Sequence, residues 1–374
     1  MVLALPRIFP YLSITMTKKN LKGLDLAELQ IFIEGLGERK YRAAQIYGWL
    51  YAAGAQNFDE MTNISKEFRN TLSQSAQITN LKSEIQKVSD DGTAKFLFQL
   101  EDRLAIESVL IPGKKQASGG ENRLTLCVST QVGCPLDCKF CATGTMGFTR
   151  NLTAGEIIDQ VIQVQRKSLQ RITNLVYMGM GEPMLNYDNV MKSIEIINDD
   201  RGLNIGARHI TISTAGYADR IRQMADEERP VKLALSLHSL DNEKRTKLMP
   251  ITKKYSVDVL IEALEYYYHK TRRRPTFEYI LFDGFNDTAA DIKAFVKLSR
   301  RIPCKVNIIP FHSIEFAHPS GIGASLTPSS PVRIEAFADA LREADITVMV
   351  RGSSGQDIQA ACGQLAVLKS KSKV

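Results

Sequence analysis

The feature that most constrains the fold of this 374-residue chain is a regular alternation of strand-like and helix-like segments. Short apolar runs rich in β-branched residues occur at 124–129, 173–178, 208–213, 231–236, 277–281 and 304–309. Each is followed by a segment of helical length, at 154–169, 186–198, 217–227, 256–270, 288–301 and 332–344. A last strand-like run lies at 346–350. Six successive βα units predict an α/β fold with a parallel sheet, arranged as a partial, TIM-like (βα)6 barrel.

The N-terminal part of the chain has a different pattern. Leu26, Leu29, Ile33 and Leu36 recur at helical spacing, and further helical patterns follow at 40–55 and 65–72. From residue 83 an Asp-Gly turn and a short alternating run predict an antiparallel β element. We therefore expect a disordered extension or a wrongly assigned start at 1–15, with Met16 as the more natural beginning. A small helical domain at 16–82 and a β extension and loop at 83–122 should follow. The partial barrel should occupy 123–365, and a flexible basic tail 366–374.

Composition narrows the class of protein. No apolar run approaches the ~20 residues of a membrane span, and six cysteines in a chain of this length do not make a disulfide scaffold. We therefore expect a cytoplasmic protein with no membrane partner. The net charge of +7 includes a basic run at 269–275. Such a run suits a polyanion such as nucleic acid, although a solvated helix end would have the same composition.

Three cysteines with the spacing C-x3-C-x2-C, Cys134, Cys138 and Cys141, predict a soft-metal site. A structural zinc site needs a fourth ligand, and no second CxxC is present, so a zinc site would have to recruit Cys127. The spacing also differs from the ferredoxin pattern. Three ligands on a four-iron cluster leave one iron open, which is useful when a metal must bind a substrate.

Polar motifs follow the predicted strands at the ends where a βα barrel places its active site. They are the GMGEP stretch with Gly181 and Glu182, then Ser213, the run Ser236-Leu237-His238, and Asn307. Glycines in GMGEP allow close backbone approach to a ligand. Any one of these motifs could be a turn or an ordinary strand end. Together, and after the cysteine loop, they predict a single site.

The cysteine loop CPLDCKFC, placed before a βα series, resembles that of the radical S-adenosylmethionine (SAM) superfamily. The resemblance implies one 4Fe–4S cluster held by Cys134, Cys138 and Cys141, whose open iron binds SAM. It also implies SAM contacts from the polar strand-end motifs, at Gly181, Glu182, Ser213, Ser236, Leu237, His238 and Asn307. Glu182 would hold the SAM ammonium group.

A narrower resemblance runs from about residue 39 to 365. The segments LCVSTQVGCPLDCKFCATG, MGMGEP, KLMPI and RGSSGQDIQAACGQL resemble the RlmN/Cfr class of adenosine methyltransferases. The resemblance implies that one SAM methylates Cys362, and that a 5′-deoxyadenosyl radical from a second SAM activates this methyl group for addition to adenine. Cys127 would then release the product through a transient disulfide with Cys362, and Glu107 would accept a proton. Cys304 remains as a packing residue.

Pro183 in GMGEP is like the RlmN branch of this class, which methylates C2 of adenosine. The implied partners are 23S rRNA near the peptidyl transferase centre, the adenosine 3′ of the tRNA anticodon, and a flavodoxin-type electron donor, with the enzyme a monomer. The helical domain would contact RNA, with Tyr41, Tyr47, Trp49 and Tyr51 either stacking on bases or forming core. The segments 114–122 and 312–331 are longer than the class pattern, and STAG replaces STSG at Ser213.

Three other readings remain open at this point. One is a Cfr-like enzyme that methylates C8. Another is a non-catalytic RNA-binding protein with a structural zinc or iron–sulfur site, which would not need a cysteine at 362. The last is a different radical SAM enzyme that acts on protein, which would not need Cys127 and Cys362 as a pair.

Replacement of Arg272, Arg273 and Arg274 by Ala tests the basic run. We expect weaker RNA binding and a flatter dependence of affinity on salt, because fewer counterions are released. SAM cleavage should be unchanged. Titrations of RNA at several salt concentrations measure both effects. Unchanged RNA affinity at every salt concentration would remove this run from the RNA surface.

Overall fold

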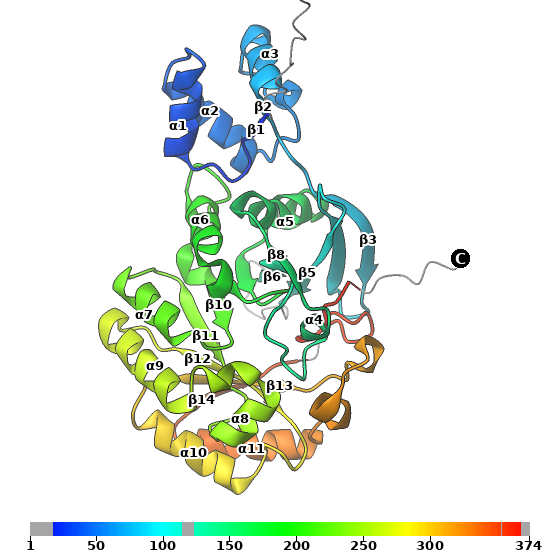
Figure 1. Cartoon of the computed structure of the whole chain (residues 1–374), viewed down its shortest axis with the longest axis vertical. Helices are drawn as coiled ribbons and strands as arrows, with labels where there is room; N and C mark the ends of the chain where they lie inside the picture. The colour runs from blue at the N-terminus through cyan, green and yellow to red at the C-terminus, as the bar shows by residue number, and fades with distance from the viewer. Residues whose placement is uncertain (1–17, 114–122, 353, 368–374) are drawn as a thin grey trace, which may run out of the picture.

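The computed structural model describes residues 18–113, 123–352 and 354–367 (Figure 1). The expected extension at 1–15, the loop 114–122 and residues 368–374 of the expected tail lie outside these described residues. The side chains of residues 84–86 are likewise not described.

A ten-stranded sheet forms the centre of the molecule, with the order β14-β13-β12-β11-β10-β9-β6-β5-β4-β3. Seven strands are parallel to one another: β6 (Leu124–Cys127), β9 (Asn174–Tyr177), β10 (Ile210–Thr214), β11 (Lys232–Ser236), β12 (Thr276–Leu281), β13 (Lys305–Pro310) and β14 (Thr347–Val350). The strands follow chain order, so each βα unit adds one strand beside the last. Because β14 and β3 are edge strands, the sheet is open, as in a partial barrel.

Six helices connect the parallel strands and lie around the outside of the sheet (Figure 1). They are α5 (Ala154–Lys167), α6 (Tyr187–Asn198), α7 (Ala218–Asp226), α9 (Val257–Thr271), α10 (Ala289–Ser299) and α11 (Pro331–Glu343). Their starts follow local sequence signals. For example, Thr153 and Glu156 form a capping box at the start of α5. The predicted α/β class and the βα alternation are confirmed.

The antiparallel extension joins the same sheet. It consists of β3 (Lys82–Val88), β4 (Ala94–Gln99) and β5 (Ala105–Pro112). Strand β5 pairs antiparallel with β6, and Val109 lies opposite Cys127. Alternate residues of a strand share a face, so Glu107 is on the same face of β5 as Val109.

Several elements were not predicted from the sequence. A hairpin of β7 (Gln131–Gly133) and β8 (Phe148–Asn151) frames the cysteine loop, which continues into the short helix α4 (Ala142–Thr145). Helix α8 (Asn242–Leu248) lies between β11 and α9. The long segment 312–331 contains two short 3-10 turns, Glu315–Ala317 and Gly321–Ser325.

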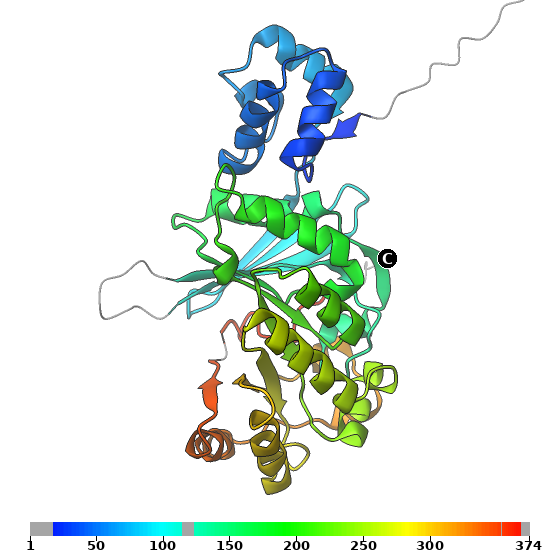
Figure 2. The same cartoon turned by 90° about the vertical axis from the view of Figure 1, so that its left-hand side faces the viewer.

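The N-terminal helices lie at one end of the molecule in both views (Figures 1 and 2). They are α1 (Leu26–Gly35), α2 (Tyr41–Tyr47) with its continuation Gly48–Ala52, and α3 (Lys66–Ser75), joined by the short strands β1 (Lys19–Asn20) and β2 (Ala76–Gln77). Tyr47 and Tyr51 are buried, so these two aromatic residues belong to the core. Trp49 is half-buried and Tyr41 is exposed.

A buried ion pair attaches the N-terminal helices to the barrel. Lys22 Nζ lies 2.6 Å from Asp159 on α5, and both side chains are almost fully buried. The second carboxylate oxygen of Asp159 accepts from the backbone N–H of Leu81 at 2.6 Å. The backbones approach closely here: a Cβ at Gly155 would lie 2.4 Å from the carbonyl oxygen of Lys22. Only glycine fits at that contact.

No helix in the described parts of the chain combines the length and the apolar character that a bilayer span requires.

Replacement of Lys22 by Met should lower the free energy of unfolding by about 3–5 kcal/mol, because Asp159 is left as a buried charge without its cation. Denaturant unfolding measures the change. The matched control is Lys192→Met, which removes the partly exposed pair with Glu28 and should cost less than about 1 kcal/mol. Equal losses in the two variants would contradict the role given to Lys22.

Candidate active site

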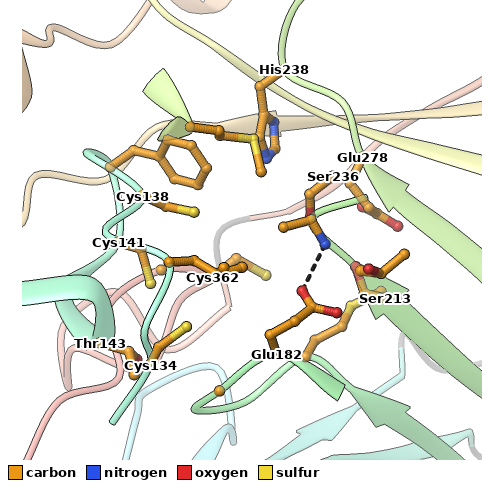
Figure 3. Close-up of a pocket in the computed structure, with 18 of the residues that line it drawn as sticks. Cys134, Cys138, Cys141, Thr143, Glu182, Ser213, Ser236, His238, Glu278 and Cys362 are labelled. Carbon is orange, nitrogen blue, oxygen red and sulfur yellow. Dashed lines mark hydrogen bonds between the residues drawn. The ribbon is translucent and has the colours of Figure 1, made fainter. Parts of the chain in front are cut away.

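A cavity lies between the cysteine loop and the carboxyl ends of strands β9 to β12 (Figure 3). Nine residues chosen from the sequence line it: Cys134, Cys138, Cys141, Gly181, Glu182, Ser213, Ser236, His238 and Cys362. We call it the first cavity. The structure therefore brings together residues separated by more than two hundred positions in the chain.

The cysteine loop is shaped by a tight turn and by hydrogen bonds to distant segments. Gly133 has a φ of +74°, and a Cβ there would lie 1.9 Å from the carbonyl oxygen of Gly147. The N–H of Lys139 donates to the carbonyl of Leu248 at 2.9 Å. The N–H of Ala142 donates to the carbonyl of Gly363 at 2.7 Å. The second of these bonds holds the segment of Cys362 against the loop.

The three thiols of the loop face the first cavity (Figure 3). Burial raises the pKa of Cys134 to about 12 and raises that of Cys138 well above its ordinary value. Such thiols are neutral unless a cation stabilises the thiolate, which is what metal coordination does. Asp137 of the same loop does not line the cavity, so the loop offers it three sulfurs, a donor set that fits an iron–sulfur cluster with one open iron.

The geometry also bears on the zinc alternative. Among residues 18–113, 123–352 and 354–367, no three His, Cys, Asp or Glu side chains lie close enough together to bind a single metal ion. Cys127 lines a different cavity and does not complete the set. These two observations disfavour a zinc ion bound by the three loop cysteines and Cys127. They do not count against an iron–sulfur cluster, because in a cluster each cysteine binds a different iron atom.

Glu182 is a buried carboxylate on the wall of the first cavity. One oxygen accepts from the N–H of Ala215 at 2.8 Å, and the other accepts from the N–H of Met184 at 3.0 Å. Burial raises the pKa of Glu182 to about 7, despite these bonds. Gly181, with a φ of +99°, lies so close to Gln131 that a Cβ would approach its side chain to 2.5 Å. The carboxylate is thus fixed and available to a cation.

His238 has one defined tautomer. Its Nδ1 accepts from the N–H of Ile280 at 3.0 Å, so the proton of the neutral ring is on Nε2. Burial lowers the pKa of His238 to about 3, so the ring stays neutral. The ring packs edge-on against Phe140 of the cysteine loop, with 4.6 Å between centroids. His238 can therefore offer an N–H donor within the first cavity.

Two residues expected to bind SAM do not line the first cavity. The side chain of Leu237 is fully buried, and its backbone N–H and carbonyl bond to Glu278 and Arg245. Asn307 on β13 donates to Glu278 Oε1 at 2.8 Å. Leu237 thus packs behind the cavity wall, and Asn307 acts through Glu278.

A second cavity adjoins the first, and Cys362 lines both. Cys127 at the end of β6 also lines the second cavity, with Arg351 and His312. Both cysteines are free thiols in the structure. Burial raises the pKa of Cys127 to about 12. The pKa of Cys362 is also raised by the loss of water around its sulfur, although part of the residue is exposed, and the charge of Arg351 opposes this shift. The two sulfur nucleophiles are thus placed around one space.

Glu107 does not line the second cavity. Its Oε1 lies 3.1 Å from Lys95 Nζ, and its Oε2 accepts from the N–H of Ala366 at 3.0 Å. Burial raises the pKa of Glu107, and Lys95 opposes this shift. Val109, on the same face of β5, does line the second cavity. Glu107 therefore lies two residues along β5 from the wall of the second cavity, next to the C-terminal segment.

Sequence reasoning missed two buried charged residues. Arg245 has no exposed surface and donates to the carbonyls of Leu237 and Ser236, each at 3.0 Å. Burial lowers the pKa of Arg245 to about 10, so it remains a cation beside the cysteine loop.

Glu278 lies within an otherwise apolar strand, TFEYIL. That single carboxylate in a buried strand was the signal that could have identified it.

Comparison with known proteins agrees with this geometry. Residues 19–78 match the family model described as the ribosomal RNA large subunit methyltransferase N-terminal domain, and residues 128–298 match the radical SAM superfamily. A probable dual-specificity RNA methyltransferase RlmN from Thermotoga sp. (strain RQ2) is 46% identical, over 95% of this chain and 99% of that protein. The corresponding protein of Syntrophobacter fumaroxidans is 45% identical, over 92% of this chain and 97% of its own length.

A solved structure has the same fold. The crystal structure of a radical SAM methyltransferase from Sphaerobacter thermophilus is 41% identical and matches with a TM-score of 0.84, over 93% of this chain and 99% of that chain. The chain belongs to the RlmN family of radical SAM RNA methyltransferases.

Proposed function

We propose that this enzyme methylates C2 of an adenosine in 23S rRNA and of the adenosine 3′ of the tRNA anticodon. The names of the relatives describe dual-specificity RNA methyltransferases, and Pro183 follows the pattern of the C2-specific branch. The observation that carries the proposal is the position of Cys362. It lines both the cavity of the three cluster cysteines and the cavity that contains Cys127.

The residues of the first cavity would hold the cofactors. Cys134, Cys138 and Cys141 would bind a 4Fe–4S cluster, and Glu182 would bind the ammonium group of SAM. When bound, the cluster and SAM supply the one-electron chemistry that yields a 5′-deoxyadenosyl radical. His238, neutral with its proton on Nε2, would offer a hydrogen bond to the bound group without adding positive charge to the first cavity. Arg245 supplies a fixed buried cation that favours the thiolate forms of the loop.

Cys362 would carry the methyl carbon. Adenine C2 is electrophilic, so it does not accept a methyl group from SAM by simple displacement, whereas a thiolate does. Placed between the two cavities, Cys362 can receive the carbon in the first and present it to a base in the second. Arg351 favours the thiolate form of Cys362 because its charge opposes the effect of burial.

Cys127 would release the product. After the carbon is joined to the base, the Cys127 sulfur bonds to the Cys362 sulfur and the sulfur–carbon bond breaks. The electron pair of that bond, with a proton, completes the methyl group. The position of Cys127 on the wall of the second cavity supports this role.

Glu107 would accept the proton that the ring carbon loses, and the unpaired electron left on the base would return to the iron–sulfur cluster, which supplies one electron to each turnover. Lys95 favours its ionised form, as a base requires. Glu107 also accepts from the N–H of Ala366 in the C-terminal segment, whose Leu365 lines the second cavity, so the carboxylate lies close to the segment that borders the proposed base site.

Nucleoside mass spectrometry tests the proposal directly. 23S rRNA and tRNA from a methylation-deficient host would be compared with and without this gene. We expect 2-methyladenosine in both RNAs when the gene is present. Appearance of 8-methyladenosine would assign the enzyme to the Cfr-like branch, and no product with an intact cluster would refute the proposed substrate.

Replacement of Cys127 by Ala should trap the reaction. Without the resolving thiol, the base stays attached to Cys362 through the transferred carbon, so a covalent protein–RNA adduct should accumulate. Denaturing gels and mass spectrometry of the digested adduct identify the linked residue. Cys362→Ala should give neither adduct nor product, and Cys304→Ala, which alters only a buried packing residue, should behave like the parent enzyme. An adduct on another residue would contradict the role of Cys362.

SAM affinity should depend on pH through Glu182. Its pKa of about 7 means that the carboxyl group is increasingly protonated below neutrality, and the neutral acid does not pair with an ammonium group. We expect the affinity to fall by up to tenfold per pH unit below about pH 7. Calorimetry of the cluster-loaded protein measures this. Glu182→Gln should bind SAM more weakly and lose the pH dependence, and a parent profile flat from about pH 5.5 to 7.5 would exclude the role.

A further inference from the structure

Glu278 on β12 is an unusual feature of the first cavity. Its side chain is nearly fully buried, and it lines that cavity. Asn307 donates to Oε1 at 2.8 Å, but Oε2 has no hydrogen-bond partner among the residues that the structure describes. A buried carboxylate oxygen without a donor carries a large desolvation penalty. Because Glu278 lines the first cavity, a ligand bound there can supply the missing donor.

The sheet register places Glu278 in a polar row. Ser236 on β11 is paired with Glu278, and Glu278 is paired with Asn307 on β13. Partners in adjacent parallel strands point to the same side of the sheet. A hydroxyl, a carboxylate and an amide therefore lie side by side on one face of the sheet, and the first two line the cavity. Figure 3 shows Glu278 near Ser236 and Ser213, on the side of the cavity away from the three cysteines.

A cation of the second cavity lies beside Glu278. Arg351 Nη2 lies 3.6 Å from Glu278 Oε1, and Arg351 lines the second cavity. Burial raises the pKa of Glu278, and Arg351 opposes this shift. The contact favours a carboxylate, which accepts stronger hydrogen bonds than a neutral acid.

We propose that Glu278 Oε2 accepts a hydrogen bond from a ribose hydroxyl of SAM. This inference rests on the proposed function, which places SAM in the first cavity. SAM offers three kinds of donor: the ammonium group, the two ribose hydroxyls and the adenine amino group. The proposed function assigns the ammonium group to Glu182, which leaves the ribose hydroxyls and the adenine amino group for Glu278.

Of the two remaining donors, the ribose hydroxyls fit the polar row of Ser236, Glu278 and Asn307 better than the adenine amino group does. The vicinal hydroxyls present two donors that are also acceptors, so Glu278 can accept from one while the hydroxyl of Ser236 donates to the diol. Adenine also presents a ring acceptor beside its amino group, but only the diol offers two adjacent groups that can each donate and accept. Glu278 is then a SAM-binding residue, and Asn307 and Arg351 are positioning residues that act through it.

The test compares ligands and variants by calorimetry on the anaerobic, cluster-loaded protein. The ligands are SAM, its 2′-deoxy and 3′-deoxy analogues, and the analogue with a 6-oxo group in place of the adenine amino group. We expect the parent protein to bind one of the deoxy analogues about 10- to 100-fold more weakly than SAM, because a hydrogen bond to a charged group is lost.

Glu278→Gln should bind SAM about 10- to 100-fold more weakly than the parent and should no longer distinguish SAM from that deoxy analogue. Full discrimination by Glu278→Gln would overturn the inference. So would equal affinity of the parent for SAM and both deoxy analogues, a result that needs no variant to fold. Discrimination against the 6-oxo analogue that disappears in Glu278→Gln would assign the oxygen to adenine and also overturn it.

These outcomes are separate from failure of the proposed function. If the parent protein does not bind SAM at all, the proposed function fails first. If the parent binds SAM and methylates RNA but Glu278→Gln keeps its ribose discrimination, only the present inference fails. Cluster absorbance per chain, measured for both proteins, shows that the variant is folded and loaded.

Discussion

The site depends on the attachment of the C-terminal segment to the cysteine loop. The N–H of Ala142 donates to the carbonyl of Gly363, and the hydroxyl of Thr143 donates to the carbonyl of Leu365 at 2.6 Å. Both bonds start one or two residues after Cys141, so the loop that would bind the cluster also positions Cys362. Without them, Cys362 would be a thiol on an untethered loop. Because it is tethered, one sulfur forms part of the walls of both cavities.

Much of the fold could be predicted because its signals are local and repeated. Strands such as β13 are predicted by apolar, β-branched residues, and helices such as α5 by their spacing and caps. Once strands and helices alternate, only a few arrangements of the strands in the sheet are possible. The hairpin β7–β8 escaped prediction because its strands are only three and four residues long. The antiparallel strands were predicted, but not that they join the parallel sheet. They join it because β5 pairs with β6, and no local sequence pattern encodes that pairing. The domain boundaries stay a prediction.

The site was partly predictable for a related reason. The cysteines and the strand-end motifs are conspicuous in sequence, and the structure gathers nine of those residues around the first cavity. Leu237 and Asn307 were chosen by resemblance, yet Leu237 packs inward and Asn307 reaches Glu278. Arg245 and Glu278 were missed because a lone charge in a helix or strand is ordinarily solvent-exposed, and only tertiary packing decides otherwise. Likewise, the position of Glu107 depends on Ala366, more than two hundred residues away in the chain.

The junction between the N-terminal helices and the barrel has a consequence for catalysis on folded RNA. Lys22 and Asp159 form a buried ion pair, and Gly23 and Gly155 bring two backbones into contact, so this junction is not a free hinge. An ion pair of this kind fixes geometry more than it adds stability. Bending at this junction would break the buried ion pair and separate the two backbones. If one RNA contacts both the helices and the cavities, the RNA would therefore have to change its own shape to deliver a base.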